Sequence, residues 1–211
     1  MSVESSIRIE KITKNCFYVQ NALSLEEQRD LTRFIKQRVK NKNIKSSAMI
    51  RSAKTLPIGE KNTPSVKFSN DDKDPPVIFV KKTIKILGRY IPSSNISGLS
   101  AAAIRYPAPE GRFPSHIDHC NDGSFVFLTS LGRTARFSIK DPDMEKSRVL
   151  AFGSGDVLVF DPSSEAKLLH SVDCIEKDSS TTGAALEREF PQLIAGHRIG
   201  VQCRVSFSEP K

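Results

Sequence analysis

The stretch FPSHIDHCNDGS, at residues 113–124, concentrates side chains that bind metals. It contains His116, Asp118 and His119, so two of the chain's four histidines flank a carboxylate. Residues two apart share one face of a strand, whereas residues three apart share one face of a helix. The proline in this stretch and the glycines around it favour an extended chain. An extended chain pairs His116 with Asp118 and turns His119 away.

A third ligand is available downstream, where His170 lies in the apolar run KLLHSV. A strand there would bring His170 to the pair His116 and Asp118. Two histidines and one carboxylate leave half of an octahedral metal open, which is the arrangement of non-haem Fe(II) oxygenases. We therefore predict Fe(II) at His116, Asp118 and His170, with the metal centre as the catalytic group. The open positions need a co-substrate.

Two arginines near the C-terminal end suit that co-substrate. In HRIGVQCR, Arg198 and Arg204 are six residues apart, an even spacing that places both guanidiniums on one face of a strand. A guanidinium can bind a carboxylate through two hydrogen bonds. A dicarboxylic keto acid would satisfy the metal and the arginines together.

The composition is that of a globular chain that needs no cross-links. Of the 211 residues 38% are hydrophobic and 27% charged, and the net charge is +8. The four cysteines form no C-x-x-C pair, which argues against structural zinc and indicates free thiols in a reducing compartment. No run approaches the roughly 18 apolar residues of a membrane span, and the first residues lack a targeting pattern. We expect a monomer in the cytoplasm or nucleus.

Two helices are predicted in the first half of the chain. In LSLEEQRDLTRFIKQRV, Ser24 and Glu27 form a capping box ahead of an apolar face. The segment DPPVIFVKKTIKILGRYI opens with prolines, which suit a helix start. Its apolar stripe comprises Val77, Val80, Ile84, Leu87 and Ile91. Residues 41–72 are polar and predict a long loop, or short strands in a flap.

From about residue 99 short runs rich in β-branched and aromatic residues alternate with turn signals. The runs are SAAAIRY, FVFLTSL, ARFSIK, RVLAF, DVLVF, KLLHSV and RIGVQCRVSF. Residues 176–196 separate the last two as a loop with a short helix. Helices followed by about seven strands predict a single α+β domain, residues 1–211, with a double-sheet barrel of jelly-roll type and helices backing one sheet.

The order and spacing of these residues resemble a known family. His116-x-Asp118, fifty-one intervening residues, His170 and then Arg198-x5-Arg204 are similar to the AlkB-like Fe(II)- and 2-oxoglutarate-dependent dioxygenases. SLGRTARF and GSGDVLVFDPSSEAKLLHSV, between these motifs, add to the resemblance, which extends from LSLEEQRDL to RVSF.

The resemblance implies a double-stranded β-helix (jelly-roll) core at residues 99–211, with helices and a substrate flap at residues 1–98. It also implies that Arg198 pairs with the distal carboxylate of 2-oxoglutarate, that Arg204 lies near its iron-binding end and that Tyr106 hydrogen-bonds it. The chain departs from the family in two places. Ile104 stands where the family has asparagine, and IGVQC lacks the Asn and Thr common between the two arginines.

The implied reaction uses O2 and 2-oxoglutarate to hydroxylate a C–H bond. On an N-methylated base the product would lose formaldehyde, so oxidative demethylation of N-alkylated bases in nucleic acid is the expected function. From Arg33 to Lys54 eight basic residues and no acid lead into the expected flap, which suits a phosphate backbone. The candidate contacts within this segment are Lys45, Arg51 and Lys54.

One feature of the sequence argues against a base as substrate. A flipped base normally stacks between aromatic rings, but the chain has no Trp and residues 41–72 contain Phe68 as their one aromatic. The alternatives are a related oxygenase acting on a protein side chain and, in a different class, a non-catalytic binding barrel. His119, His197 and Cys120 are assigned no role.

Overall fold

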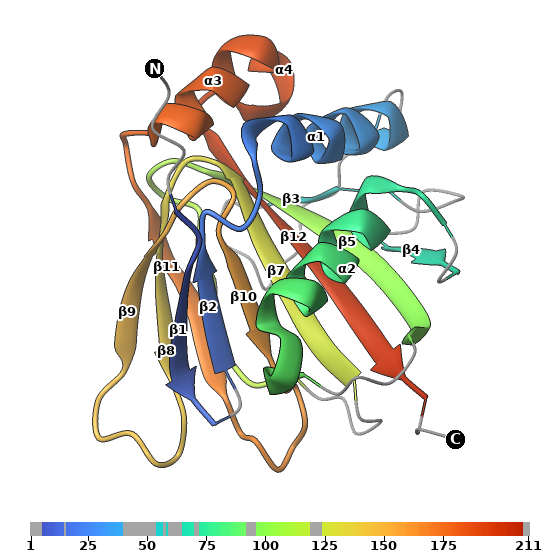
Figure 1. The fold of residues 1–211 in the computed structure, drawn as a ribbon. Helices are drawn as coiled ribbons and strands as arrows, with labels where there is room; N and C mark the ends of the chain where they lie inside the picture. The colour runs from blue at the N-terminus through green and yellow to red at the C-terminus, as the bar shows by residue number, and fades with distance from the viewer. Residues whose placement is uncertain are drawn as a thin grey trace.

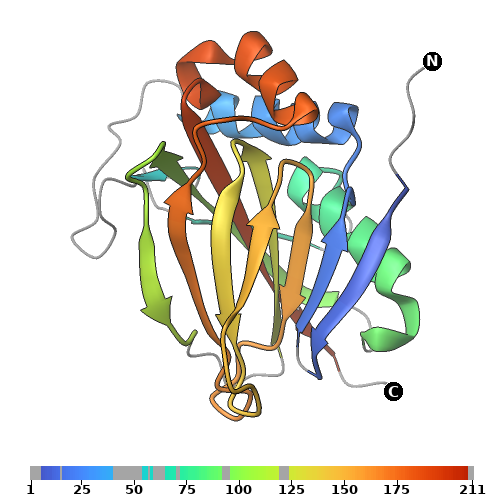
Figure 2. The same cartoon turned by 90° about the vertical axis from the view of Figure 1, so that its left-hand side faces the viewer.

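Two antiparallel β-sheets face each other, and helices cover one of them (Figures 1 and 2). The computed structural model describes residues 6–14, 16–39, 54–56, 58, 65–69, 72–91, 96–118 and 124–208. The larger sheet contains, in spatial order, β1 (Arg8–Thr13), β2 (Cys16–Gln20), β10 (Val157–Phe160), β7 (Ser124–Gly132), β12 (His197–Phe207), β5 (Ile96–Pro107) and β3 (Lys54–Leu56), with β4 (Ser65–Phe68) also on β5. The smaller sheet contains β6 (Phe113–His116), β11 (Leu169–Ile175), β8 (Ala135–Lys140) and β9 (Arg148–Phe152). The predicted jelly-roll core and α+β class are confirmed.

Alternation along β12 divides the interior into two cores, because successive side chains of a strand point to opposite faces. Side chains of one parity pack beneath α1 (Leu25–Val39) and α2 (Pro75–Leu87): Ile199, Val201, Cys203 and Val205. Side chains of the other parity line a cavity between the two sheets: Arg198, Gly200, Gln202 and Arg204. The central strand thus carries both the support for the helices and the polar groups of the site.

Helix α1 begins as the sequence predicts. The backbone N–H of Ser24 donates to Oε2 of Glu27 at 2.7 Å, and the backbone N–H of Glu27 donates to Oγ of Ser24 at 3.3 Å. These two bonds complete the capping box and satisfy donors at the helix start. The apolar face, which includes Leu31 and Ile35, is buried against the larger sheet.

Helix α2 is shorter than its apolar stripe. It starts at Pro75 and ends at Leu87, although the stripe continues to Ile91. Gly88 follows with φ +49° and begins the 3-10 turn Gly88–Tyr90. Glycine takes a positive φ without a Cβ clash, so it ends the α-helix here.

The N-terminal hairpin was not predicted. Strands β1 and β2 pair with each other, and β2 also pairs with β10 of the barrel. The run CFYVQ of β2 has the aromatic and β-branched composition of a buried strand. In the polar region 41–72 the structure describes β3 and β4, in agreement with short strands. Residues 176–196 contain two helices, α3 (Thr181–Glu189) and α4 (Pro191–Ile194), where one was predicted.

Two further expectations can be compared with the structure. None of the described helices has the length and apolar character that crossing a membrane requires. Cys16, Cys174 and Cys203 are free thiols. Cys120 lies outside the described residues.

Candidate metal centre

A cavity of about 270 Å³ lies between the two sheets and holds the predicted site residues. Its polar lining comes from β12, from the strands that carry His116 and His170, and from Tyr106 on β5. Its apolar lining includes Ile104, Phe113, Leu128, Phe137, Phe160 and Val172. A concave, mostly apolar pocket with a few convergent polar groups is the usual form of a small-molecule site.

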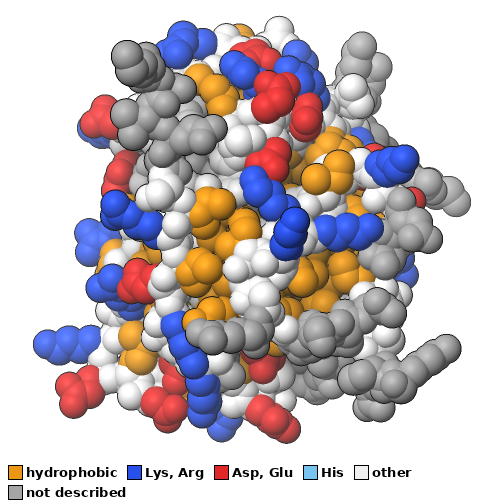
Figure 3. Space-filling view, in the orientation of Figure 1, with side chains coloured by type: hydrophobic (Ala, Val, Ile, Leu, Met, Phe, Trp, Pro, Cys, Tyr) orange, Lys and Arg blue, Asp and Glu red, His pale blue; other side chains and the backbone are white. Residues whose placement is uncertain are grey.

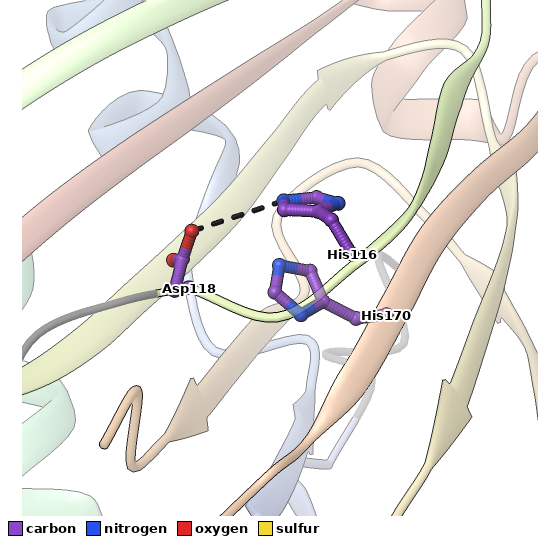
Figure 4. Close-up of side chains that lie close together, drawn as sticks. All are labelled: His116, Asp118 and His170. Carbon is purple, nitrogen blue, oxygen red and sulfur yellow. Dashed lines mark ion pairs between the residues drawn. The ribbon is translucent and has the colours of Figure 1, made fainter. Parts of the chain in front are cut away.

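His116, Asp118 and His170 each direct one ligand atom to a common point (Figure 4). These three atoms lie within 4.8 Å of one another, and Nε2 of His116 is 3.8 Å from Oδ1 of Asp118. His116 ends β6 and is the direct partner of His170 on β11. The structure therefore brings together the three residues that the sequence selected, from two segments separated by more than fifty residues.

Backbone carbonyls orient both imidazoles. Nδ1 of His116 is 2.8 Å from the carbonyl oxygen of Pro114, and Nδ1 of His170 is 3.2 Å from that of Leu168. A carbonyl oxygen only accepts hydrogen bonds, so each Nδ1 carries the proton when the ring is neutral. Nε2 of each ring is then the nitrogen with a free lone pair. Metal-binding histidines commonly have such a partner on their second nitrogen.

Aromatic packing keeps His170 out of water. Its ring packs against Phe160 and Phe137, with ring-centroid distances of 4.8 Å and 6.2 Å. Burial lowers the pKa of His170 to about 4, and the neighbouring His116 shifts it in the same direction. The neutral imidazole is the form that binds metals.

Asp118 lies beyond the end of β6, so side chains from another strand contact its carboxylate. Nη2 of Arg204 is 3.2 Å from Oδ1, and Nε2 of Gln202 donates to Oδ2 at 3.1 Å. Gln202 was not predicted as a site residue. The signal was present, because Gln202 has the same strand parity as Arg198 and Arg204.

Arg198 is buried at the other end of the polar lining. It is 1% exposed, and its Nε donates to Oγ of Ser130 at 2.9 Å. Its guanidinium carbon is 5.1 Å from the Tyr106 ring centroid and 5.3 Å from that of Phe152. Among the described residues, Nη2 of Arg198 has no hydrogen-bond partner. A buried cationic donor without a partner is costly, and an anionic ligand at this position would satisfy it.

Burial shifts the pKa of both groups at this end. It lowers the pKa of Arg198 and raises that of Tyr106 to about 12, while contact between the two side chains opposes each shift. Tyr106 therefore keeps its phenolic proton near neutral pH and can donate it to a bound oxygen. Ser130, which holds Arg198, was not predicted, although a hydroxyl in the apolar run FVFLTSL was a visible signal.

The remaining predicted residues lie elsewhere. Lys54 is exposed on β3, while Lys45, Arg51, His119 and Cys120 lie outside the described residues. His197 is half-buried, with Nδ1 2.6 Å from the carbonyl oxygen of Ala195.

Solved structures with similar folds are known. One titled "The structure of OsALKBH1" has a TM-score of 0.68 at 17% identity and covers 92% of this chain and 100% of its own. A Pseudomonas putida prolyl-4-hydroxylase has a TM-score of 0.55 at 12% identity, covering 92% and 93%. A Trichoplax adhaerens prolyl hydroxylase, solved with a peptide fragment of hypoxia inducible factor, has a TM-score of 0.57 at 14% identity, covering 92% and 84%.

The sequence matches no protein-family model and no curated protein. The AlkB homologue and the prolyl hydroxylases are members of the Fe(II)- and 2-oxoglutarate-dependent dioxygenases. At identities of 12% to 17%, the similarity to these structures shows a shared fold but does not show a shared substrate. The chain has the double-stranded β-helix fold of the Fe(II)- and 2-oxoglutarate-dependent dioxygenases.

Proposed function

We propose that this protein is an Fe(II)- and 2-oxoglutarate-dependent dioxygenase. The observation that carries the proposal is one cavity with a His-Asp-His cluster and a buried arginine whose Nη2 lacks a partner among the described residues. His116, Asp118 and His170 would hold Fe(II), since two imidazoles and a carboxylate suit an octahedral first-row metal. Arg198 would bind the distal carboxylate of 2-oxoglutarate, and Tyr106 would donate a hydrogen bond to it.

When bound, Fe(II) and 2-oxoglutarate supply the oxidising power that converts O2 and a substrate C–H bond to C–OH, with succinate and CO2 as the other products. The chain contributes binding and exclusion of water. Arg198, whose Nε donates to Ser130, would bind a carboxylate of the co-substrate. Phe137 and Phe160 shield the metal end of the cavity.

Gly200 leaves the space that the Arg198 guanidinium occupies. A Cβ at Gly200 would lie 2.8 Å from Nη1 of Arg198, which is shorter than the van der Waals contact of a Cβ atom with a nitrogen. We expect Gly200→Ala to displace the guanidinium and to weaken 2-oxoglutarate binding about tenfold, because it strains one charge-assisted contact worth about 1.5 kcal/mol. Calorimetric titration of 2-oxoglutarate measures this change. Gly98→Ala is the matched control, since a Cβ at Gly98 meets no atom within 4 Å. Equal affinities in the two variants would contradict this function of Gly200.

For the substrate we propose an N-alkylated base in nucleic acid. The similar fold of OsALKBH1, an AlkB homologue, supports this choice. Lys54 gives limited support: it is an exposed cation on β3, but it pairs with Arg105 of β5, which has the opposite strand parity to the cavity-lining Ile104 and Tyr106. The helical part of the basic segment gives less support. Arg33 forms ion pairs with Glu26, Asp30 and Glu189, and Figure 3 shows Lys and Arg mixed with Asp and Glu over this face.

A protein side chain is the second candidate substrate, and the placement of Phe68, the one aromatic residue of region 41–72, favours it. Every Phe and Tyr of the sequence is among the described residues, and the chain has no Trp. Phe68, on β4, is 9% exposed and packs against Phe34 of α1, with ring centroids 5.9 Å apart. It therefore belongs to the core beneath the helices and is not placed to stack on a flipped base. The prolyl hydroxylases share the fold as well.

The two substrate classes predict different responses to salt. If Arg51 and Lys54 contact phosphates, replacing both by Ala should weaken oligonucleotide binding for every sequence alike. It should also flatten the slope of log affinity against log salt by up to about 1.4 to 1.8, or 0.7 to 0.9 per contact. Fluorescence anisotropy over a salt series measures this slope.

The matched control replaces two exposed lysines elsewhere, Lys85 on α2 and Lys146 in the β8–β9 loop, and should leave the slope unchanged. Formaldehyde and succinate release from methylated oligonucleotides and peptides, with Asp118→Ala as the inactive reference, identifies the substrate class. If the protein turned over peptides alone, a protein side chain would be the substrate instead of nucleic acid. The same conclusion would follow if the changes at Arg51 and Lys54 left oligonucleotide affinity unaltered.

A further inference from the structure

Both oxygens of the Asp118 carboxylate are engaged by side chains from β12. Arg204 contacts Oδ1 at 3.2 Å, and Gln202 donates to Oδ2 at 3.1 Å. The carboxylate is 11% exposed, so water competes weakly for these positions. A carboxylate can only accept hydrogen bonds, and the amide nitrogen of Gln202 is therefore the atom that must face it.

The two ends of the Gln202–Asp118 contact differ in how firmly the backbone holds them. Gln202 lies in the middle of β12, opposite Ala102 of β5 on one side and Leu128 of β7 on the other. Asp118 lies past His116, the last residue of β6, and outside the strand ladder. The direction of the Asp118 carboxylate thus depends on its side-chain partners, and both of these, Gln202 and Arg204, lie on β12, a strand paired on both edges.

The two carboxylate oxygens are not equivalent. Oδ1 is the oxygen 3.8 Å from Nε2 of His116, on the side of the imidazoles, and Oδ2 is the oxygen that Gln202 holds. A donor on Oδ2 presents Oδ1 toward the histidines and fixes the rotation of the carboxylate. Partners of this kind commonly tune a metal site through its ligands.

We propose that Gln202 is a positioning residue that aims Oδ1 of Asp118 at the metal. The proposal rests on the metal centre of the proposed function and assigns a role to a residue outside the ligand set. Removing the Gln202 amide should lower metal affinity about 10- to 100-fold. The effect should arise only from the lost orientation of the Asp118 carboxylate, and the protein should remain folded.

The test measures Ni(II) binding to the full-length protein by titration, without 2-oxoglutarate or substrate. Gln202→Met keeps the length of the side chain and removes its N–H donor. Gln202→Asn keeps the amide but is one methylene shorter. Both should weaken Ni(II) binding about 10- to 100-fold, and Ser206→Ala, on the same strand and outside the cavity, should not. Thermal melts establish that each variant is folded.

A double-mutant cycle separates positioning from packing. In an Asp118→Ala background two imidazoles still bind Ni(II) weakly, and Gln202→Met should then cause no further loss. A loss that persists in this background, or unchanged affinity in Gln202→Met and Gln202→Asn, would overturn the positioning role and leave the proposed function intact. Failure of the unmodified protein to bind Ni(II) would overturn the metal centre itself, and the positioning role with it.

Discussion

Asp118→Ala is expected to abolish turnover of 2-oxoglutarate. Asp118 provides the one carboxylate in the described cluster, so the change leaves two imidazoles and no anionic ligand. Loss of the anionic ligand should weaken Fe(II) and Mn(II) binding by more than the roughly 100-fold that outer-shell changes reach, because hard divalent ions favour carboxylate oxygen. Metal content after dialysis and 2-oxoglutarate consumption measure the two effects.

A second aspartate offers a matched control for this experiment. Asp173 is on β11, the strand of His170, and accepts hydrogen bonds from Ser138 at 2.5 Å and Ser171 at 2.7 Å. Asp173→Ala removes a carboxylate of similar burial that lies outside the cavity, and it should retain metal and turnover. If Asp118→Ala consumed 2-oxoglutarate at the parent rate, the assignment of the metal site would be wrong.

Arg198→Lys should cost about 3 to 5 kcal/mol of 2-oxoglutarate binding, which is more than about a hundredfold in Kd. The reason is burial, since a carboxylate that enters this end of the cavity leaves water and depends on the guanidinium for its hydrogen bonds. A lysine ammonium lacks the planar fork that binds a carboxylate through two nitrogens. It also cannot reproduce the bond from Nε to Ser130.

Calorimetry or a competition assay with the metal-loaded protein gives the affinity of this variant. Arg148→Lys is a suitable control, because Arg148 forms an exposed ion pair with Glu10 at 3.0 Å on the outside of the barrel. Exposed pairs contribute little, so this change should leave 2-oxoglutarate binding unaltered. An unchanged Kd in Arg198→Lys would transfer carboxylate recognition to Arg204 or to another residue.

Local pattern was sufficient for the class of fold and for the types of residue at the site. Strand parity along RIGVQCRVSF placed Arg198 and Arg204 on one face, and the structure shows them on the cavity side of β12. The capping box at Ser24 and Glu27 defined the start of α1 for the same reason. Strand parity and the capping box both depend only on residues that are near one another in sequence. Such local relations are what composition and periodicity encode.

Contacts between distant segments could be decided only by the tertiary structure. The pairing of His116 with Asp118 was predicted from strand parity, yet Asp118 lies beyond the strand, and side chains more than eighty residues away contact its carboxylate. The hairpin β1–β2 joins β10, about 140 residues downstream, and no local pattern specifies such a partner. Ser130 and Gln202 were missed for the same physical reason. A side chain's own neighbours in sequence determine which way it points, but what it meets there depends on how the sheets close around it.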